Sequence, residues 1–370
     1  DVLTTLIGNA LANALNGNDG NNRLDGGALN DTMVGGKGND IYVVGELGDD
    51  VIENGNEGAD TVEALIDGYT LDDNIENLTL AGGAKVGTGN ALGNNIVGNA
   101  TLGNVINGGG GVDTMTGGAA GDTYYVDTSL DVIQDGTGGG VDLVVATGNY
   151  ALGDNLENMN LAGIDNINGY GNDLGNTIAG NNGNNQIDGG NGFDTASYAA
   201  AAAGVNVNLG TGQASGGGGS DTLLNVEGVV GSNYGDNLTG NNGVNELNGG
   251  VGGDTMAGGS GSDVYYVDDG NDLVVETDNV SAGGGVGGFD LSIYAGVSDT
   301  VNASISYTLG SFLENLQQVG TANLNGIGND LRNGMNGNDG NNGLQGLGDI
   351  DTLTGGLGND SLDGGAGDDI

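Results

Sequence analysis

The stretch GGVGGDTMAGGSGSDVYY, residues 249–266, contains two consecutive copies of one nine-residue pattern. Each copy begins with Gly-Gly-x-Gly-x-Asp and has a large apolar residue two positions after the Asp, Met256 in the first copy and Tyr265 in the second. Glycine adopts positive φ without steric cost, so such a hexad favours a tight turn whose carbonyls can converge on a cation. The three residues that follow favour a short strand whose central side chain points inward.

The same pattern recurs along the chain. Full hexads begin at Gly35, Gly108, Gly189, Gly249, Gly258, Gly355 and Gly364, and imperfect ones at Gly26, Gly117 and Gly346. Two nine-residue units would close one coil, and stacked coils would bury a continuous apolar stripe. Acids also recur at this two-unit spacing, in the pairs Asp31 and Asp49, Asp113 and Asp131, Asp236 and Asp254, Asp254 and Asp272, and Asp351 and Asp369. The spacing predicts an all-β fold: a parallel β-roll or β-solenoid with irregular β segments between rolls and very little helix.

The composition excludes several classes of function. The chain of 370 residues has 84 Gly and 50 Asp and Glu against 4 Lys and Arg, for a formal charge of -46, and it lacks Cys and His. Such a charge opposes nucleic-acid and anionic-membrane partners, and also opposes compaction unless cations neutralise it. Thiolate and imidazole chemistry are absent, and no apolar run approaches the roughly 20 residues of a membrane helix. We therefore expect no enzyme, no nucleic-acid binding, no membrane insertion, and cations as part of the fold.

These units resemble the glycine- and aspartate-rich RTX (haemolysin-type) calcium-binding repeats of secreted bacterial proteins. The resemblance implies several Ca²⁺ ions, each between two stacked turns and held by sixth-position carboxylates and by carbonyls of the second and fourth Gly. Carried over, the carboxylate ligands are Asp31, Asp40, Asp49, Asp113, Asp122, Asp131, Asp194, Asp236, Asp254, Asp263, Asp272, Asp351, Asp360 and Asp369. The glycine ligands are Gly36, Gly38, Gly109, Gly111, Gly190, Gly192, Gly250, Gly252, Gly259, Gly261, Gly356, Gly358, Gly365 and Gly367.

Some coil partners carry Asn in place of Asp. Asn22 pairs with Asp40 in this way, as do Asn176 with Asp194, Asn245 with Asp263, and Asn342 with Asp360. Such sites lose a charge, so they are expected to bind calcium weakly or to be Asn ladders without metal.

A longer module contains the nonapeptides, because similar Gly-Asn-x-Leu-x-Asn segments begin at Gly8, Gly89, Gly171 and Gly328. We expect rolls at residues 1–44, 89–126, 171–198, 231–267 and 328–370, the last cut mid-repeat. Linking β segments are expected at 45–88, 127–170 and 268–327, an inserted β segment at 199–230, and a Gly-rich loop from Ser281 to Gly288 within the last linker.

Three further sets of residues recur with this module. Tyr42, Tyr124 and Tyr265 are expected to fill a widened interior, and their neighbours Tyr125 and Tyr266 to face outward. A second set, Glu76, Glu157 and Glu314, indicates a structural role or an auxiliary calcium site. The third set consists of acid pairs that could hold an auxiliary ion: Asp49 with Glu53, Asp131 with Asp135, and Asp272 with Glu276.

The resemblance also implies an extracellular or cell-surface bacterial protein, exported by type I secretion machinery and folded by external calcium. We expect a structural section of a large extracellular array, adhesin, surface layer or filament, whose partners are calcium and other copies or further repeats end to end. The pattern continues to both ends of the chain, which fits such a section. The alternative is a calcium-folded accessory or C-terminal module of a secreted protease, epimerase, lipase or toxin, whose catalytic domain lies outside this chain.

Overall fold

The computed structural model describes residues 3–136, 138, 140–277 and 298–370, and the predicted loop from Ser281 to Gly288 lies outside them. The described residues form strands and turns without a helix. They therefore contain no helix long and apolar enough to cross a membrane. The chain divides into two compact units. The first comprises Asp1–Gly163 and Ile167–Asn176, and the second Ile164–Asn166 and Thr177–Ile370.

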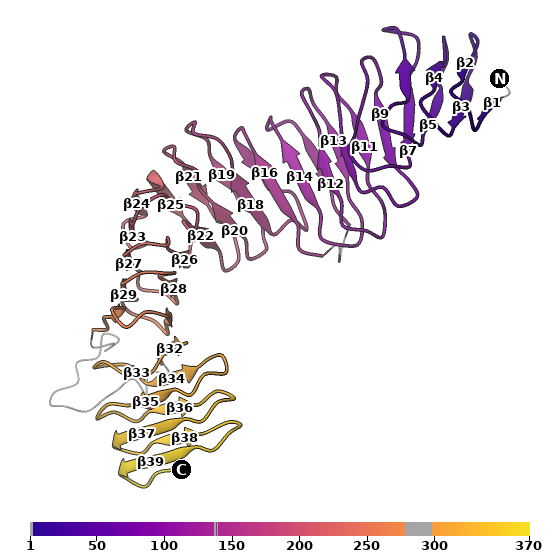
Figure 1. The fold of residues 1–370 in the computed structure, drawn as a ribbon. Helices are drawn as coiled ribbons and strands as arrows, with labels where there is room; N and C mark the ends of the chain where they lie inside the picture. The colour runs from indigo at the N-terminus through magenta and orange to yellow at the C-terminus, as the bar shows by residue number, and fades with distance from the viewer. Residues whose placement is uncertain (1–2, 137, 139, 278–297) are drawn as a thin grey trace. The chain divides into compact units, whose positions relative to one another are not determined.

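The first unit is a parallel β-solenoid in which the chain passes alternately through facing sheets (Figure 1). One sheet has the order β1-β3-β5-β7-β9-β11-β13-β15, and the others contain β2-β4-β6, β8-β10-β12-β14-β16-β18 and β17-β19. The strands are β1 Thr4–Asn9, β2 Ala14–Asn16, β3 Asn22–Gly27, β4 Thr32–Val34, β5 Ile41–Val44, β6 Asp50–Ile52, β7 Thr61–Ala64, β8 Tyr69–Thr70, β9 Asn77–Leu80, β10 Val86–Thr88, β11 Asn95–Val97, β12 Val105–Asn107, β13 Thr114–Thr116, β14 Thr123–Val126, β15 Val132–Gln134, β16 Leu143–Ala146, β17 Tyr150–Ala151, β18 Asn158–Leu161 and β19 Gly169–Tyr170.

The second unit repeats this arrangement. Its sheets contain β20-β22-β26-β28-β30-β32-β34-β36-β38, β21-β25-β24-β23-β27-β29-β31 and β33-β35-β37-β39. The strands are β20 Thr177–Ala179, β21 Gln186–Asp188, β22 Thr195–Ser197, β23 Val205–Asn208, β24 Gln213–Gly216, β25 Gly219–Leu224, β26 Gly228–Val230, β27 Asn237–Thr239, β28 Glu246–Asn248, β29 Thr255–Ala257, β30 Val264–Val267, β31 Leu273–Val274, β32 Thr300–Ala303, β33 Tyr307–Thr308, β34 Asn315–Gln318, β35 Asn325–Ile327, β36 Gly334–Asn336, β37 Gly343–Gly348, β38 Thr352–Thr354 and β39 Ser361–Ala366.

The apolar residue of each unit lies directly on its counterpart one coil away. Leu24 of β3 pairs with Tyr42 of β5, and Leu247 of β28 pairs with Tyr265 of β30. All four side chains are fully buried. The two-unit coil and its narrow apolar interior are therefore confirmed.

The linking segments continue the same sheets with coils of different length. The step along the chain from Tyr42 to its partner Val62 is longer than the step from Leu24 to Tyr42, and the step from Val62 to its partner Leu78 is shorter. The predicted irregular segments are thus coils whose turns are longer or shorter than a nonapeptide turn. The boundaries proposed for the individual rolls and linkers remain predictions.

The insertion at 199–230 departs from the parallel arrangement. The expected strand around Val205 and Val207 forms β23, with both side chains buried. However, β24 pairs antiparallel with β23 and with β25. Strands joined by short connections can pair antiparallel, whereas parallel pairing requires a longer crossover.

Candidate metal sites

The sixth-position side chains form a ladder along each edge of the solenoid. The Oδ1 atom of Asp40 accepts a hydrogen bond from the backbone N–H of Asn22, 18 residues earlier, at 2.6 Å. The backbone N–H of Asp31 donates in the same way to Asp49 Oδ1 at 3.0 Å. The other predicted pairs show the same contact: Asp113 with Asp131, Asp236 with Asp254, Asp254 with Asp272, and Asp351 with Asp369. The acids predicted to stack are therefore in register.

One class of turn, which we call the open turn, has positive φ at the second and fourth residues of the hexad. Most of these residues are the predicted ligand glycines, namely Gly36, Gly38, Gly109, Gly111, Gly190, Gly192, Gly250, Gly252, Gly259, Gly261, Gly356 and Gly358. Two imperfect hexads keep this conformation without glycine at the fourth residue, which is Leu29 in one and Asp349 in the other. Gly365 has positive φ as well, but Gly367 does not.

Six of the open turns contain a buried carboxylate oxygen without a hydrogen-bond partner among the described residues. The Oδ2 atom accepts no hydrogen bond from the described residues in Asp31, Asp40, Asp113, Asp254, Asp263 and Asp351. Each of these side chains is at most 1% exposed. Burying a polar atom without a hydrogen bond costs several kcal/mol, roughly 2–7, and more for a charge. A cation within the turn would supply the missing partner, so the open turns fit Ca²⁺, which prefers carboxylate and carbonyl oxygens.

In a second class, the closed turn, an oxygen of the sixth side chain accepts a hydrogen bond from a backbone N–H of the same turn. Asn22 Oδ1 accepts the backbone N–H of Asn18, four residues earlier, at 2.7 Å. The same closure occurs at Asn13, Asn94, Asn176, Asn185, Asn245, Asn333 and Asn342, and at Asn104 the donor is five residues earlier. These Asn turns contain no residue of positive φ. Whether these turns bind calcium weakly or form Asn ladders without metal remains a prediction.

Several predicted ligands also lie in closed turns. Asp122 Oδ2 accepts the N–H of Gly118 at 2.8 Å, and Asp236 Oδ2 accepts the N–H of Ser232 at 2.6 Å. The acids at the ends of rolls behave similarly, since N–H groups of their own turns donate to Oδ2 of Asp49, Asp131 and Asp272. Their carboxylates already have hydrogen-bond partners.

Burial disfavours the charged form of two open-turn carboxylates, those of Asp113 and Asp254. It raises the pKa of Asp113 and of Asp254 to about 6, an effect that the backbone N–H donors partly oppose. Neighbouring acids, Asp131 for Asp113 and Asp236 for Asp254, add to the rise. A bound cation would oppose this effect, because opposite charge favours the ionised form.

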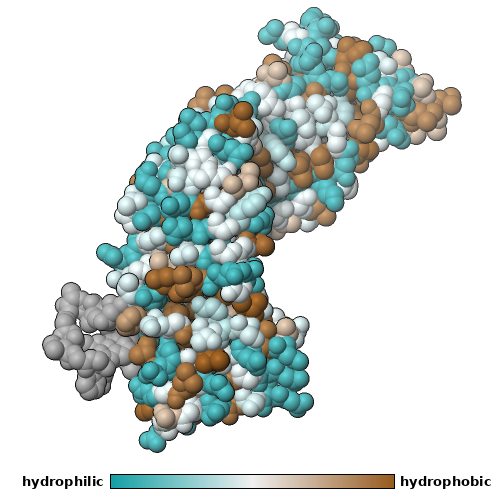
Figure 2. Space-filling model, turned by 60° about the vertical axis from the view of Figure 1, so that its left-hand side comes forward, coloured by the Kyte–Doolittle hydropathy of each residue, from teal (hydrophilic) through white to brown (hydrophobic). Residues whose placement is uncertain are grey.

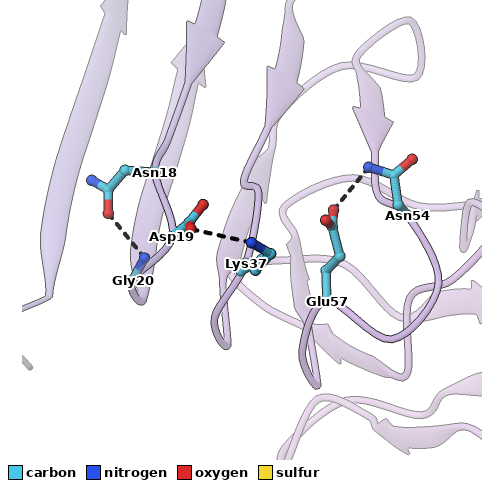
Figure 3. Close-up of polar contacts among 6 residues, drawn as sticks. All are labelled: Asn18, Asp19, Gly20, Lys37, Asn54 and Glu57. Carbon is cyan, nitrogen blue, oxygen red and sulfur yellow. Dashed lines mark hydrogen bonds and ion pairs between the residues drawn. The ribbon is translucent and has the colours of Figure 1, made fainter.

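Two of the four Lys and Arg residues form ion pairs, both with acids outside the open turns. Lys37 Nζ contacts Asp19 Oδ2 at 3.2 Å between neighbouring coils, beside the exposed Asn18–Gly20 and Asn54–Glu57 contacts (Figure 3). Arg23 contacts Glu63 at 2.7 Å. These are the ion pairs that the described residues form, and neither reaches an open-turn carboxylate. The face in Figure 2 shows exposed hydrophobic residues interspersed with hydrophilic ones.

The tyrosines that recur with the module differ in burial. Tyr42, Tyr124 and Tyr265 are fully buried, Tyr125 is exposed, and Tyr266 is half-buried. The recurring glutamates extend the ladder, because backbone N–H groups of Asp60, Asp142 and Asp299 donate to Glu76, Glu157 and Glu314.

The second acid of each predicted pair lies in a group of three. Glu53 lies with Asp40 and Asp60, while its pairing with Asp49 remains a prediction. Equivalent groups contain Asp122, Asp135 and Asp142, and Asp263, Glu276 and Asp299. The sequence reasoning missed Asp60, Asp142 and Asp299, although each directly precedes a strand at the same place in its module.

The fold and the turns together define a parallel β-solenoid built on glycine-rich turns that hold buried carboxylates. A family profile for the RTX calcium-binding nonapeptide repeat matches the chain in four copies, at residues 7–42, 103–128, 230–274 and 336–370. The chain therefore carries RTX calcium-binding nonapeptide repeats. No curated protein matches it.

Proposed function

We propose that the chain is a secreted structural repeat protein whose open turns bind calcium. The observation that carries the proposal is that six buried Oδ2 atoms lack hydrogen-bond partners among the described residues and lie in turns with two residues of positive φ, namely those of Asp31, Asp40, Asp113, Asp254, Asp263 and Asp351. In this proposal the ions lie between stacked turns, with the sixth-position Asp and the second and fourth glycine carbonyls as ligands. Asp254 with Gly250 and Gly252 is the most complete example, since its neighbours in the ladder are also Asp.

Calcium and folding are linked in this proposal. A site that the unfolded chain lacks contributes its binding free energy to folding. Chelation is therefore expected to convert a β-rich circular dichroism spectrum into that of a disordered chain. A spectrum unchanged in excess chelator at low salt would contradict calcium-dependent folding.

A variant with one ladder carboxylate removed tests whether the open turns hold the ions. Asp254→Asn removes one charge from the ladder, and calorimetry should show fewer bound calcium ions than in the unmodified chain. Asp154→Asn removes the same charge from an exposed position and should leave the number unchanged. Equal stoichiometry in both variants would place the ions elsewhere.

The wider role proposed is that of a section of an extracellular array, adhesin, surface layer or filament, exported through type I secretion machinery in bacteria. It is supported by repetition, because the three acidic clusters found among the described residues recur at equivalent places in the modules. In such a role the chain would meet further repeats or other copies end to end. Native mass measured with light scattering, in calcium and in chelator, tests this association.

A further inference from the structure

Each of three strands that carry a buried tyrosine is accompanied by three carboxylates in the interior. One oxygen from each of Asp40, Glu53 and Asp60 lies within 4.8 Å of the other two. We call this group and its two equivalents, Asp122 with Asp135 and Asp142, and Asp263 with Glu276 and Asp299, the interior clusters. Asp40 and Asp263 also belong to open turns, and Asp142 follows Gly138 and Gly140 of positive φ, whereas Glu53, Asp135 and Glu276 lie outside these turns and set the clusters apart from them.

The members of a cluster come from three successive parts of the coil. Asp40 directly precedes β5, Glu53 directly follows β6, and Asp60 directly precedes β7. β5 and β7 are paired neighbours in one sheet, whereas β6 belongs to another sheet. Glu53 therefore reaches the other two acids from the opposite part of the coil.

The carboxylates are buried and incompletely partnered. Asp40 is 1% exposed and Glu53 is 7% exposed, and neither Asp40 Oδ2 nor Glu53 Oε2 has a hydrogen-bond partner among the described residues. The other clusters also contain such atoms, Oδ2 of Asp135, Asp142 and Asp263. Three acids this close repel one another when ionised, and leaving their oxygens without partners is costly.

The surroundings orient the carboxylates without neutralising them. The Tyr42 hydroxyl donates to Glu53, and the Tyr265 hydroxyl donates to Glu276. In the second cluster the Tyr124 hydroxyl donates to Asp135 at 3.2 Å. The backbone N–H of Asp40 fixes Asp60 Oδ1 at 2.7 Å. The ion pairs formed by the described residues use Glu63 and Asp19, so none supplies positive charge here.

We propose that each interior cluster binds one divalent cation, with Ca²⁺ as the ion the chain meets under its proposed function. Three carboxylates offer oxygen donors only, the set that hard cations such as Ca²⁺ prefer. In the first cluster, the ion would link β5 and β7, which are neighbours in one sheet, to Glu53 in the turn after β6 of another sheet. It would stabilise the coil between β5 and β7. There the distance along the chain between hydrogen-bonded ladder residues increases from 18 to 20 residues.

The test uses the near-isosteric variant Glu53→Gln/Asp135→Asn/Glu276→Gln. Calcium bound per chain, measured by equilibrium dialysis with metal analysis, is expected to fall by three ions, one for each cluster. Three acids outside the clusters, in Glu57→Gln/Asp154→Asn/Asp165→Asn, provide a control with the same change of charge and no expected loss. An unchanged ion count in the cluster variant overturns the proposal.

The stability of the cluster variant is a second test, because the change expected at saturating calcium has opposite signs for a cluster with an ion and for one without. In a cluster without an ion, removing a repelling buried charge stabilises the fold in calcium and in chelator alike. In a cluster that binds an ion, the same change lowers the denaturant midpoint at saturating calcium. Higher stability of the cluster variant at saturating calcium therefore contradicts the proposal.

Two further outcomes separate this proposal from that for the open turns. If Asp254→Asn loses calcium and the cluster variant does not, only the interior clusters are refuted. If the unmodified chain binds three ions and Asp254→Asn loses none, the open turns are refuted and the clusters stand. Should the triple variant fail to fold, Glu53→Gln alone is expected to lose one ion, and an unchanged count there is equally decisive.

Discussion

Single residues can hold backbone conformations that their side chains disfavour. The turn after β8 places Asn74 at φ 65°, and the equivalent turns place Asn155 at φ 64° and Phe312 at φ 68°. Asn tolerates this left-handed region, whereas for a bulky residue it costs roughly 1–2 kcal/mol. The two Asn side chains also donate to the backbone carbonyls of Glu53 and Asp135.

Phe312→Asn is therefore expected to stabilise the protein by about 1 kcal/mol. The new side chain would relieve the strain and could donate to a carbonyl as its two counterparts do. Urea unfolding at saturating calcium measures the gain. Phe312→Ala serves as the control, because it keeps the disfavoured φ, and equal stabilities of the Asn and Ala variants would refute the explanation.

The two turn classes can be distinguished at a pair of stacked glycines. Gly261 lies in an open turn at φ 142°, and a Cβ there would overlap the carbonyl oxygen of Gly243. Gly243 lies in a closed turn, where a Cβ would meet only Asn241 Oδ1, at 3.2 Å. Gly261→Ala is expected to cost about 2 kcal/mol and to weaken calcium binding, and Gly243→Ala to change both little. Calorimetry and thermal unfolding of the two variants would contradict this if their losses were equal.

At the scale of the element, the sequence predicted the features that repeat with its nine-residue period. The nine-residue spacing predicted short strands, two-unit coils and the stacking of Leu24 on Tyr42. It could not predict the interior clusters, because Asp60 follows a coil of altered length and so falls outside the period. Nor does residue identity alone decide the class of turn. Leu29 and Ala120 both replace the fourth glycine, but only Leu29 adopts positive φ, in an open turn.

Strand β34 contains a buried polar residue where its counterparts are apolar. Gln318 is 1% exposed, and neither its Oε1 nor its Nε2 has a hydrogen-bond partner among the described residues. Leu80 in β9 and Leu161 in β18 occupy the equivalent position and are buried. The amide thus loses its hydration without gaining hydrogen bonds in return.

Gln318→Leu is expected to raise the unfolding free energy by about 1–3 kcal/mol, the cost of an unsatisfied buried polar group. Equilibrium denaturation at saturating calcium measures the change. Gln317→Leu, in the neighbouring and more exposed position of the same strand, is the control and should give little or no gain. A destabilised Gln318→Leu variant would show that the amide has a partner in the folded protein.

At the scale of the whole molecule, charge governs how stability depends on pH. The formal charge is -46, and many of the acids are buried. Burial raises the pKa of Glu53 and Asp142 to about 7 and that of Glu276 to about 8. In the unfolded chain these groups titrate near about 4. Between these values, the folded chain without cations binds more protons than the unfolded chain.

The cation-free protein should therefore be most stable below about pH 4 and lose stability as the pH rises through about 7 to 8. In chelator, lowering the pH from 8 to 5 is expected to raise the urea midpoint or the β content. At saturating calcium the sign reverses, because protons compete with the ions for the same oxygens. The variant Glu53→Gln/Asp135→Asn/Glu276→Gln should show a shallower pH dependence in chelator, since it removes two of these groups and also Asp135, whose pKa burial raises as well. If the midpoint shifts in the same direction with and without calcium, the buried carboxylates are not the groups that bind the ions.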